Sequence, residues 1–184
     1  MRGLSSHLRR DSYGNRGEAS LTPEEYLGTS YKPDCDFVDG QLQERNVGED
    51  QHALFQMAVI LWFGRYMEQW HLFPLPEMRI QVGPSRFRVA DICVVQGTPP
   101  VGVLDQPPLI VIEILSPEDR VHRYKERVED YRRMGISNIW VIDPITCDGF
   151  DCSTDNWNRT EVFRVNGTEI FMPVRELAIK RDVI

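Results

Sequence analysis

The stretch PLIVIEILSPEDRVHRYKERVEDYRRMGISNIWVIDP, residues 108–144, decides the fold. Its two ends, 108–115 and 138–144, are short apolar runs that are typical of buried strands. The polar run between them predicts a helix, with Ser116 placed to cap its start and Gly135 marking its end. A strand, a helix and a second strand in this order predict two parallel strands joined by a right-handed crossover.

The rest of the chain adds helices and hairpins around this unit. Residues 21–27 predict a short capped helix, and residues 49–71 predict a long helix that is apolar around much of its circumference. Turn residues between apolar runs predict hairpins over 36–45, 77–95 and 160–173. The fold class that follows is α/β in the mixed α+β sense, a central mixed β-sheet flanked by helices.

Length and composition bound the architecture. The 184 residues suit one domain, which we expect over 21–184, preceded by a disordered arm over 1–20. We find neither a secretion signal nor an apolar run long enough to cross a bilayer, so a cytoplasmic protein is expected. The four cysteines lack zinc-ligand spacing, and the net charge of −7 argues against a protein that coats nucleic acid without excluding a local basic patch.

Two acids interrupt apolar strands and carry the functional prediction. Asp91 lies in RFRVADICVV and Glu113 in LIVIEIL, and an ionised carboxylate in such a setting is costly unless it is compensated. If the two strands are neighbours, the carboxylates converge and can share a divalent cation that activates a water molecule. The alternative is that each acid caps a loop or pairs with an arginine, such as Arg86, Arg88 or Arg120.

A family resemblance joins these segments. RFRVADICVV, PPLIVIEILSPEDR and YRRMGISNIWVIDP, supported by DGQLQER at 39–45 and EDQHALF at 49–55, resemble the Uma family of endonucleases in the PD-(D/E)XK restriction-endonuclease-like superfamily. The resemblance covers about residues 21–175. It implies a restriction-endonuclease-like core, a metal-dependent endonuclease that cleaves DNA, and pairing of two copies as a homodimer.

The resemblance also implies the metal ligands. Asp91 matches the first acid of the superfamily, although Ala90 replaces the usual proline, and Glu113 matches the second. Together with the backbone carbonyl of Ile114, these residues would bind Mg²⁺ or Mn²⁺. On this interpretation a cation, rather than a salt bridge, compensates the negative charge of Glu113.

The superfamily's lysine is where this chain departs. Leu115 stands at the usual position, and the Uma family moves the lysine to four residues before a tyrosine, which here makes it Arg127. Lys125 is the nearest lysine, but at about 100° per residue the two side chains lie on opposite edges of the helix. We therefore favour Arg127 as the catalytic group that stabilises charge or orients water, with Lys125 as the second candidate.

Further residues are assigned to supporting roles. A histidine and two acids near the start of the long helix are auxiliary candidates: His52, Glu44 and Glu49. Basic residues of the 116–135 helix could guide a nucleic-acid backbone: Arg120, Arg123, Arg132 and Arg133.

Two other functions stay open beside the nuclease. A catalytically impaired relative of the same fold would bind nucleic acid or protein, and the missing lysine and the acidic net charge favour it. A glycosidase that uses a pair of carboxylates without a metal is the third hypothesis.

Overall fold

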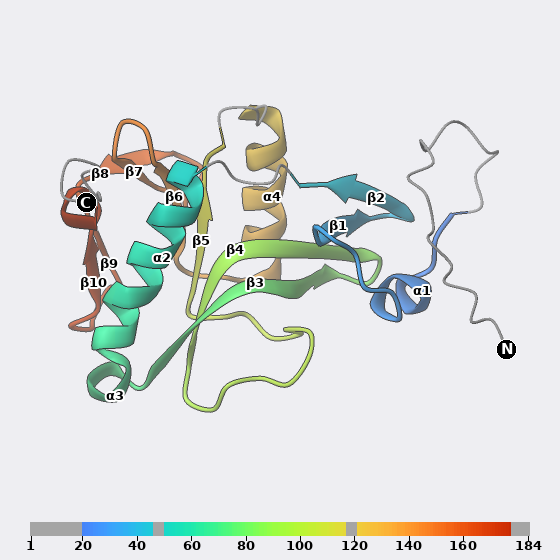
Figure 1. The fold of residues 1–184 in the computed structure, drawn as a ribbon, viewed down its shortest axis with the longest axis horizontal. Helices are drawn as coiled ribbons and strands as arrows, with labels where there is room; N and C mark the ends of the chain where they lie inside the picture. The colour runs from blue at the N-terminus through green and yellow to red at the C-terminus, as the bar shows by residue number, and fades with distance from the viewer. Residues whose placement is uncertain (1–19, 46–49, 117–120, 178–184) are drawn as a thin grey trace, which may run out of the picture.

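The computed structural model describes residues 20–45, 50–116 and 121–177. An eight-stranded sheet forms its centre, with the order β2-β1-β4-β5-β6-β7-β8 and with β3 paired to β4 (Figure 1). The strands of this sheet are β1 (Cys35–Val38), β2 (Gln41–Glu44), β3 (Leu72–Gly83), β4 (Arg86–Gln96), β5 (Ile110–Ile114), β6 (Ile139–Asp143), β7 (Asp148–Asp151) and β8 (Asn158–Thr160). A small second sheet consists of β9 (Val162–Arg164) and β10 (Phe171–Pro173).

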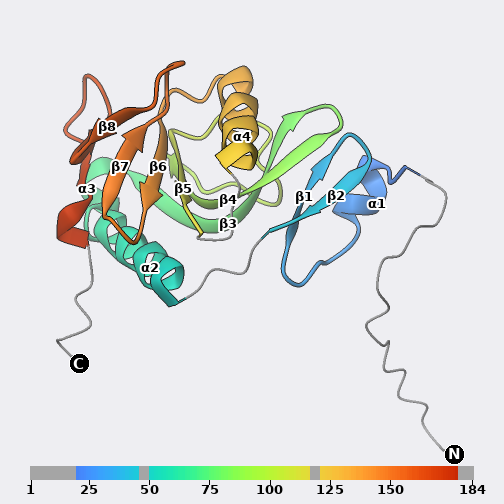
Figure 2. The same cartoon turned by 90° about the horizontal axis from the view of Figure 1, so that it is seen from above.

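The helices cover both faces of the large sheet. They are α1 (Pro23–Leu27), α2 (Asp50–Arg65), α3 (Met67–Trp70), α4 (Val121–Met134) and a 3₁₀ turn, η1 (Arg175–Leu177). In Figures 1 and 2, α2 lies against one face and α4 against the other. No helix among the described residues is both long and apolar enough to cross a membrane.

The predicted β-α-β unit is confirmed and the sheet is mixed. β5 and β6 run parallel, while the other strand pairs are antiparallel. Alternate residues of β5 serve the two faces: Ile112 packs in the core on the α2 side, whereas Val111 packs beneath α4 with Val128 and Tyr131. Gly135 ends α4 with a φ of +92°, as predicted, whereas its predicted start at residues 117–120 lies outside the described residues.

Other local predictions are also confirmed. Thr22 and Glu25 form the capping box of α1. The β1–β2 turn has Asp39 and Gly40 at positive φ, +48° and +91°, which is the backbone that this hairpin turn requires. The closing hairpin of the chain is β9–β10.

The helix predicted over 49–71 is interrupted near its C-terminal end. α2 ends at Arg65, Tyr66 interrupts the helix, and His71 ends α3 with a φ of +52°. The break lets the chain reverse into β3, and the ring of Tyr66 stacks on Trp70 at 4.2 Å.

Three strand segments were not predicted. β3 begins at Leu72 rather than Glu77. Its first part contains Pro74 and Pro76, which a strand tolerates when, as here, it pairs with a neighbour on one edge. The other two segments are β7 and β8, whose short, polar sequences carry no clear strand pattern.

Candidate active site

The candidate site lies where β1 and β5 separate along β4. β3 takes one edge of β4 over nearly its whole length. On the other edge, β1 pairs only with Arg86 and Phe87, and β5 pairs only with Ile92–Val94. The segment between them, 88–91, has no strand partner on that edge.

Side chains take the place of a strand in this gap. The N–H of Val89 donates to Asp36 at 2.8 Å, and its carbonyl accepts from Arg127 at 2.5 Å. The carbonyl of Asp91 accepts from Gln56 of α2 at 2.8 Å. The backbone of β4 is therefore satisfied by polar groups from three different elements, which brings those groups to one place.

The two faces of the β3–β4 hairpin exchange sides at the same point. On β3, Leu75 and Met78 both pack on the α4 side, although strict alternation would put them on opposite faces. On β4, Ala90 and Cys93 break the alternation in the same way. Between them, and opposite Asp91 in the register, Glu77 has a φ of +54°. The reversal lets Asp91 face the residues of α2.

Asp91 is buried and held by several donors. Its Oδ2 accepts from the N–H of Ile114 at 2.8 Å and lies 3.2 Å from Nε2 of His52, while Oδ1 is bound by the guanidinium of Arg45. Burial alone would raise the pKa of Asp91, but the hydrogen bond from His52 and the charge of Arg45 lower it to about 2. Burial lowers the pKa of His52, and its contacts with Asp91 outweigh this and raise it.

Glu113 is also compensated by protein groups. Its Oε1 accepts from Arg127 at 2.8 Å and from the hydroxyl of Tyr131 at 2.5 Å, and its side chain is 1% exposed. Burial raises its pKa to about 7, Asp91 adds to the rise, and Arg127 opposes it. An ion pair with Arg127 therefore compensates Glu113 in this structure, and compensation by a metal ion stays a prediction. Among the described residues, the arginines that pair with the two acids are Arg45 and Arg127. Of the arginines suggested as partners from the sequence, Arg86 and Arg88 pair with other acids, and Arg120 lies outside the described residues.

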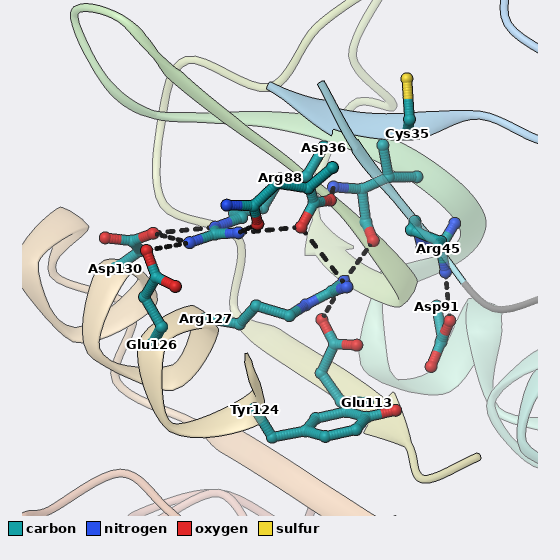
Figure 3. A network of polar contacts seen from close by, with 12 residues as sticks. Cys35, Asp36, Arg45, Arg88, Asp91, Glu113, Tyr124, Glu126, Arg127 and Asp130 are labelled. Carbon is teal, nitrogen blue, oxygen red and sulfur yellow. Dashed lines mark hydrogen bonds and ion pairs between the residues drawn. The ribbon is translucent and has the colours of Figure 1, made fainter. Parts of the chain in front are cut away.

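A chain of buried ion pairs extends from Arg127 (Figure 3). Arg127 lies 3.5 Å from Asp36, which is 3.0 Å from Arg88. Arg88 in turn contacts Asp130 of α4 at 2.6 Å. The side chain of Arg88 is buried, with 1% of its surface exposed. Asp36 thus connects the two arginines, and Arg127 is held on both sides by carboxylates.

The remaining predicted residues divide between the site and other surfaces. Glu44 and His52 line the cavity with Asp91, Glu113 and Arg127. Those that the structure does not bring to this cavity are Lys125, which is exposed, Arg132, which donates to the carbonyl of Cys152, and Arg133, which pairs with Glu129. Glu49, Arg120 and the side chain of Arg123 lie outside the described residues.

The cavity is small and strongly polar. Its volume is about 30 Å³, which is room for a water molecule or an ion. Its lining contains Asp36, Glu44, Asp91 and Glu113 as acids, and Arg45, Arg88 and Arg127 as arginines. Four acids against three arginines give a formal charge of −1 when His52 is neutral.

Comparison with known proteins agrees with this fold. The Uma2 family model, described as "Putative restriction endonuclease", matches residues 23–178. The chain belongs to the Uma2 family. The Uma2 fold is also seen in the crystal structure of "a putative nuclease belonging to DUF820" from Anabaena variabilis, with a TM-score of 0.74 at 18% identity over 86% of this chain and 97% of that one. A search of curated proteins gives no match.

The donor set in this Uma2 protein suits a hard divalent cation. Two carboxylates, Asp91 and Glu113, and the carbonyl of Ile114 offer oxygen atoms of the kind that such a cation binds. The carbonyl of Ile114 accepts from the hydroxyl of Tyr124 at 3.0 Å, and the N–H of Ile114 joins β5 to β4 through Asp91. The described residues contain no preassembled group of three acidic, histidine or cysteine side chains. A metal ion that used Oδ1 of Asp91 or Oε1 of Glu113 would compete with the arginine that now holds that oxygen.

Sequence reasoning missed Asp36, Arg45 and Glu77. Asp36 carries the same signal as the two predicted acids, a carboxylate within the buried strand CDFV. Arg45 and Glu77 have no local signal, since their importance comes from contacts with residues far away in the chain.

Proposed function

We propose that this Uma2 protein is a nuclease that hydrolyses DNA phosphodiester bonds with a divalent metal ion. The observation that carries the proposal is the convergence of Asp91 and Glu113, from neighbouring strands, in one buried polar cavity. These two residues and the carbonyl of Ile114 would hold Mg²⁺ or Mn²⁺. Such an ion, when bound, acidifies a water molecule and balances the charge of the phosphodiester in transit.

The protein groups around the two acids have separate tasks. Tyr131 and Arg127 fix Oε1 of Glu113, and His52 with the N–H of Ile114 fixes Oδ2 of Asp91. Arg127 stays protonated, so it cannot act as a general base; it contributes fixed positive charge beside the reacting phosphate. A cytoplasmic location, a homodimer and a role for Arg120, Arg123, Arg132 and Arg133 in guiding DNA remain predictions.

One observation favours a second candidate function. Arginines hold both acids, and no lysine belongs to the described lining of the cavity. A relative that binds nucleic acid or protein without cleaving it would keep this arrangement, because ion pairs hold the acids without any metal.

Nicking of supercoiled plasmid separates the two functions. We expect the wild type to nick with Mg²⁺ or Mn²⁺, and we expect EDTA and Glu113→Gln to abolish nicking. Glu161→Gln is the matched control, since Glu161 is 73% exposed and pairs with Arg175 outside the cavity. A wild type that is folded by circular dichroism, nicks no plasmid and binds no Mn²⁺ in calorimetry would overturn the nuclease in favour of the binding module.

Arg127→Lys tests the departure from the family pattern. A lysine supplies one ammonium group and cannot serve Glu113, Asp36 and the carbonyl of Val89 as the forked guanidinium does. If the arginine alone impairs catalysis, nicking rises in the variant. Unchanged nicking means that Arg127 is not part of a catalytic site, and lower nicking means that its guanidinium itself contributes to catalysis.

A further inference from the structure

Arg45 lies where a metal ion would compete for a ligand. Its guanidinium bridges two carboxylates, with one nitrogen on Asp91 and another on Glu77. The side chain is 11% exposed and lines the cavity. A positive charge of the protein itself therefore occupies one oxygen of a proposed metal ligand.

Arg45 and Arg127 differ in how firmly they are held. Arg127 donates to a backbone carbonyl, that of Val89, as well as to Glu113, and it has Asp36 on its other side. Displacing it would leave a buried carbonyl without its donor, which is costly. Arg45 instead has as its second partner Glu77, whose side chain is 47% exposed and can be solvated when Arg45 moves.

The charge of the cavity favours replacement of Arg45 at Asp91 by a metal ion only when a phosphodiester binds together with that ion. With His52 neutral and the four acids ionised, the formal charge of the lining residues is −1, so a divalent cation alone would change it to +1. A phosphodiester carries one negative charge and would return the sum to zero. In a partly buried site, where charges are poorly screened, the neutral combination is the more stable one.

We propose that Arg45 is the exchangeable cation of this site and the residue that binds the substrate phosphate. As a phosphodiester enters, the guanidinium leaves Asp91 for the phosphate oxygens, which its fork matches, and Asp91 becomes available to the metal ion. This inference rests on the proposed function. It makes binding of metal and of nucleic acid mutually reinforcing, by a coupling that passes through Arg45.

Calorimetry of Mn²⁺ binding tests the exchange without measuring cleavage. The titrations use wild type and Arg45→Gln, each alone and with a saturating DNA duplex of about 12 base pairs. The linkages of this duplex are phosphorothioates, so that it is not cleaved during the titration. For the wild type, we expect DNA to raise the affinity for Mn²⁺ about tenfold, a typical coupling. For Arg45→Gln, we expect tighter Mn²⁺ binding than wild type without DNA, and little further gain when DNA is added.

Control variants separate exchange from a general loss of positive charge. Arg86→Gln removes the same charge from an arginine that pairs with Glu126 and Asp130 and touches neither metal ligand. We expect it to bind Mn²⁺ as the wild type does. Equal tightening in Arg86→Gln and Arg45→Gln, or an unchanged effect of DNA in Arg45→Gln, would overturn the inference.

The same titrations distinguish this inference from the proposed function. If wild type and Glu113→Gln bind Mn²⁺ equally, or neither binds it, the proposed metal site fails and the exchange fails with it. If wild type binds and Glu113→Gln does not, the metal site stands. In that case, failure of Arg45→Gln to tighten binding refutes the exchange alone. Should Arg45→Gln not fold, absence of any DNA effect on Mn²⁺ affinity in the wild type refutes it equally.

Discussion

Arg88→Met should destabilise the protein strongly, because it leaves two buried acids without their shared cation. The side chain of Arg88 is 1% exposed, and those of Asp36 and Asp130 are 4% and 3% exposed. Arg88 contacts Asp36 at 3.0 Å and Asp130 at 2.6 Å. Removing one member of a buried ion pair costs about 3–5 kcal/mol of unfolding free energy, since the remaining charge stays buried.

The remaining partners of the two acids put the expected loss at the lower end of that range. Asp36 keeps the N–H of Val89 at 2.8 Å and Arg127 at 3.5 Å, and Asp130 keeps Arg86 at 3.3 Å. We therefore expect Arg88→Met to lower the unfolding free energy by about 3 kcal/mol. At roughly 2–4 °C per kcal/mol for a chain of this size, the midpoint of thermal unfolding falls by roughly 6–12 °C.

Urea unfolding followed by circular dichroism measures this loss. Arg133→Met is the matched control, because Arg133 lies on the same network but is 64% exposed, and its loss should stay within about 0.5 kcal/mol. A loss of unfolding free energy below about 1 kcal/mol for Arg88→Met, or equal losses in the two variants, would refute the hypothesis that the buried ion pairs stabilise the site.

Three further predictions concern packing and titration. Gly149→Ala should lower the free energy of unfolding by about 1–3 kcal/mol, because the added Cβ would come within 2.8 Å of Phe163. Gly64→Ala, on the open face of α2, is the control and should cause no loss. Urea unfolding that ranks the two variants the other way would contradict this packing. Affinity for Mn²⁺ should rise with pH up to about 7 and then level off, because the pKa of Glu113 is raised to about 7 and metal binding must release its proton. An affinity that calorimetry finds unchanged from about pH 5.5 to about pH 8 would contradict this. Tyr131→Phe removes a hydrogen bond that lowers the pKa of Glu113, so the same pH profile should shift upward, and an unshifted profile would show that the hydroxyl does not act on this acid.

The sequence predicted the features that depend on neighbouring residues. The β-α-β unit, the capping box at Thr22 and the turn at Gly40 follow from periodicity and backbone chemistry within a few residues. Asp91 and Glu113 could be singled out for the same reason, since an acid within an apolar strand is visible in the sequence alone.

Periodicity failed where the tertiary structure imposes a change of direction. The long predicted helix breaks at Tyr66, because the chain must turn into β3. The faces of β3 and β4 reverse at Glu77, whose positive φ no local pattern announces. Strict alternation is a property of an undistorted strand, and the reversal occurs beside the candidate site.

The partners of the two acids were decided by the tertiary structure alone. Helical geometry put Arg127 and Lys125 on opposite edges of α4, but only the packed sheet determines that Arg127 faces Glu113. Arg45 meets Asp91 across 46 residues of chain. The sequence thus determined which groups need compensation, because burial in an apolar strand is a local property. The packing of distant strands and helices determined which charges supply it, because ion pairing depends on proximity in space.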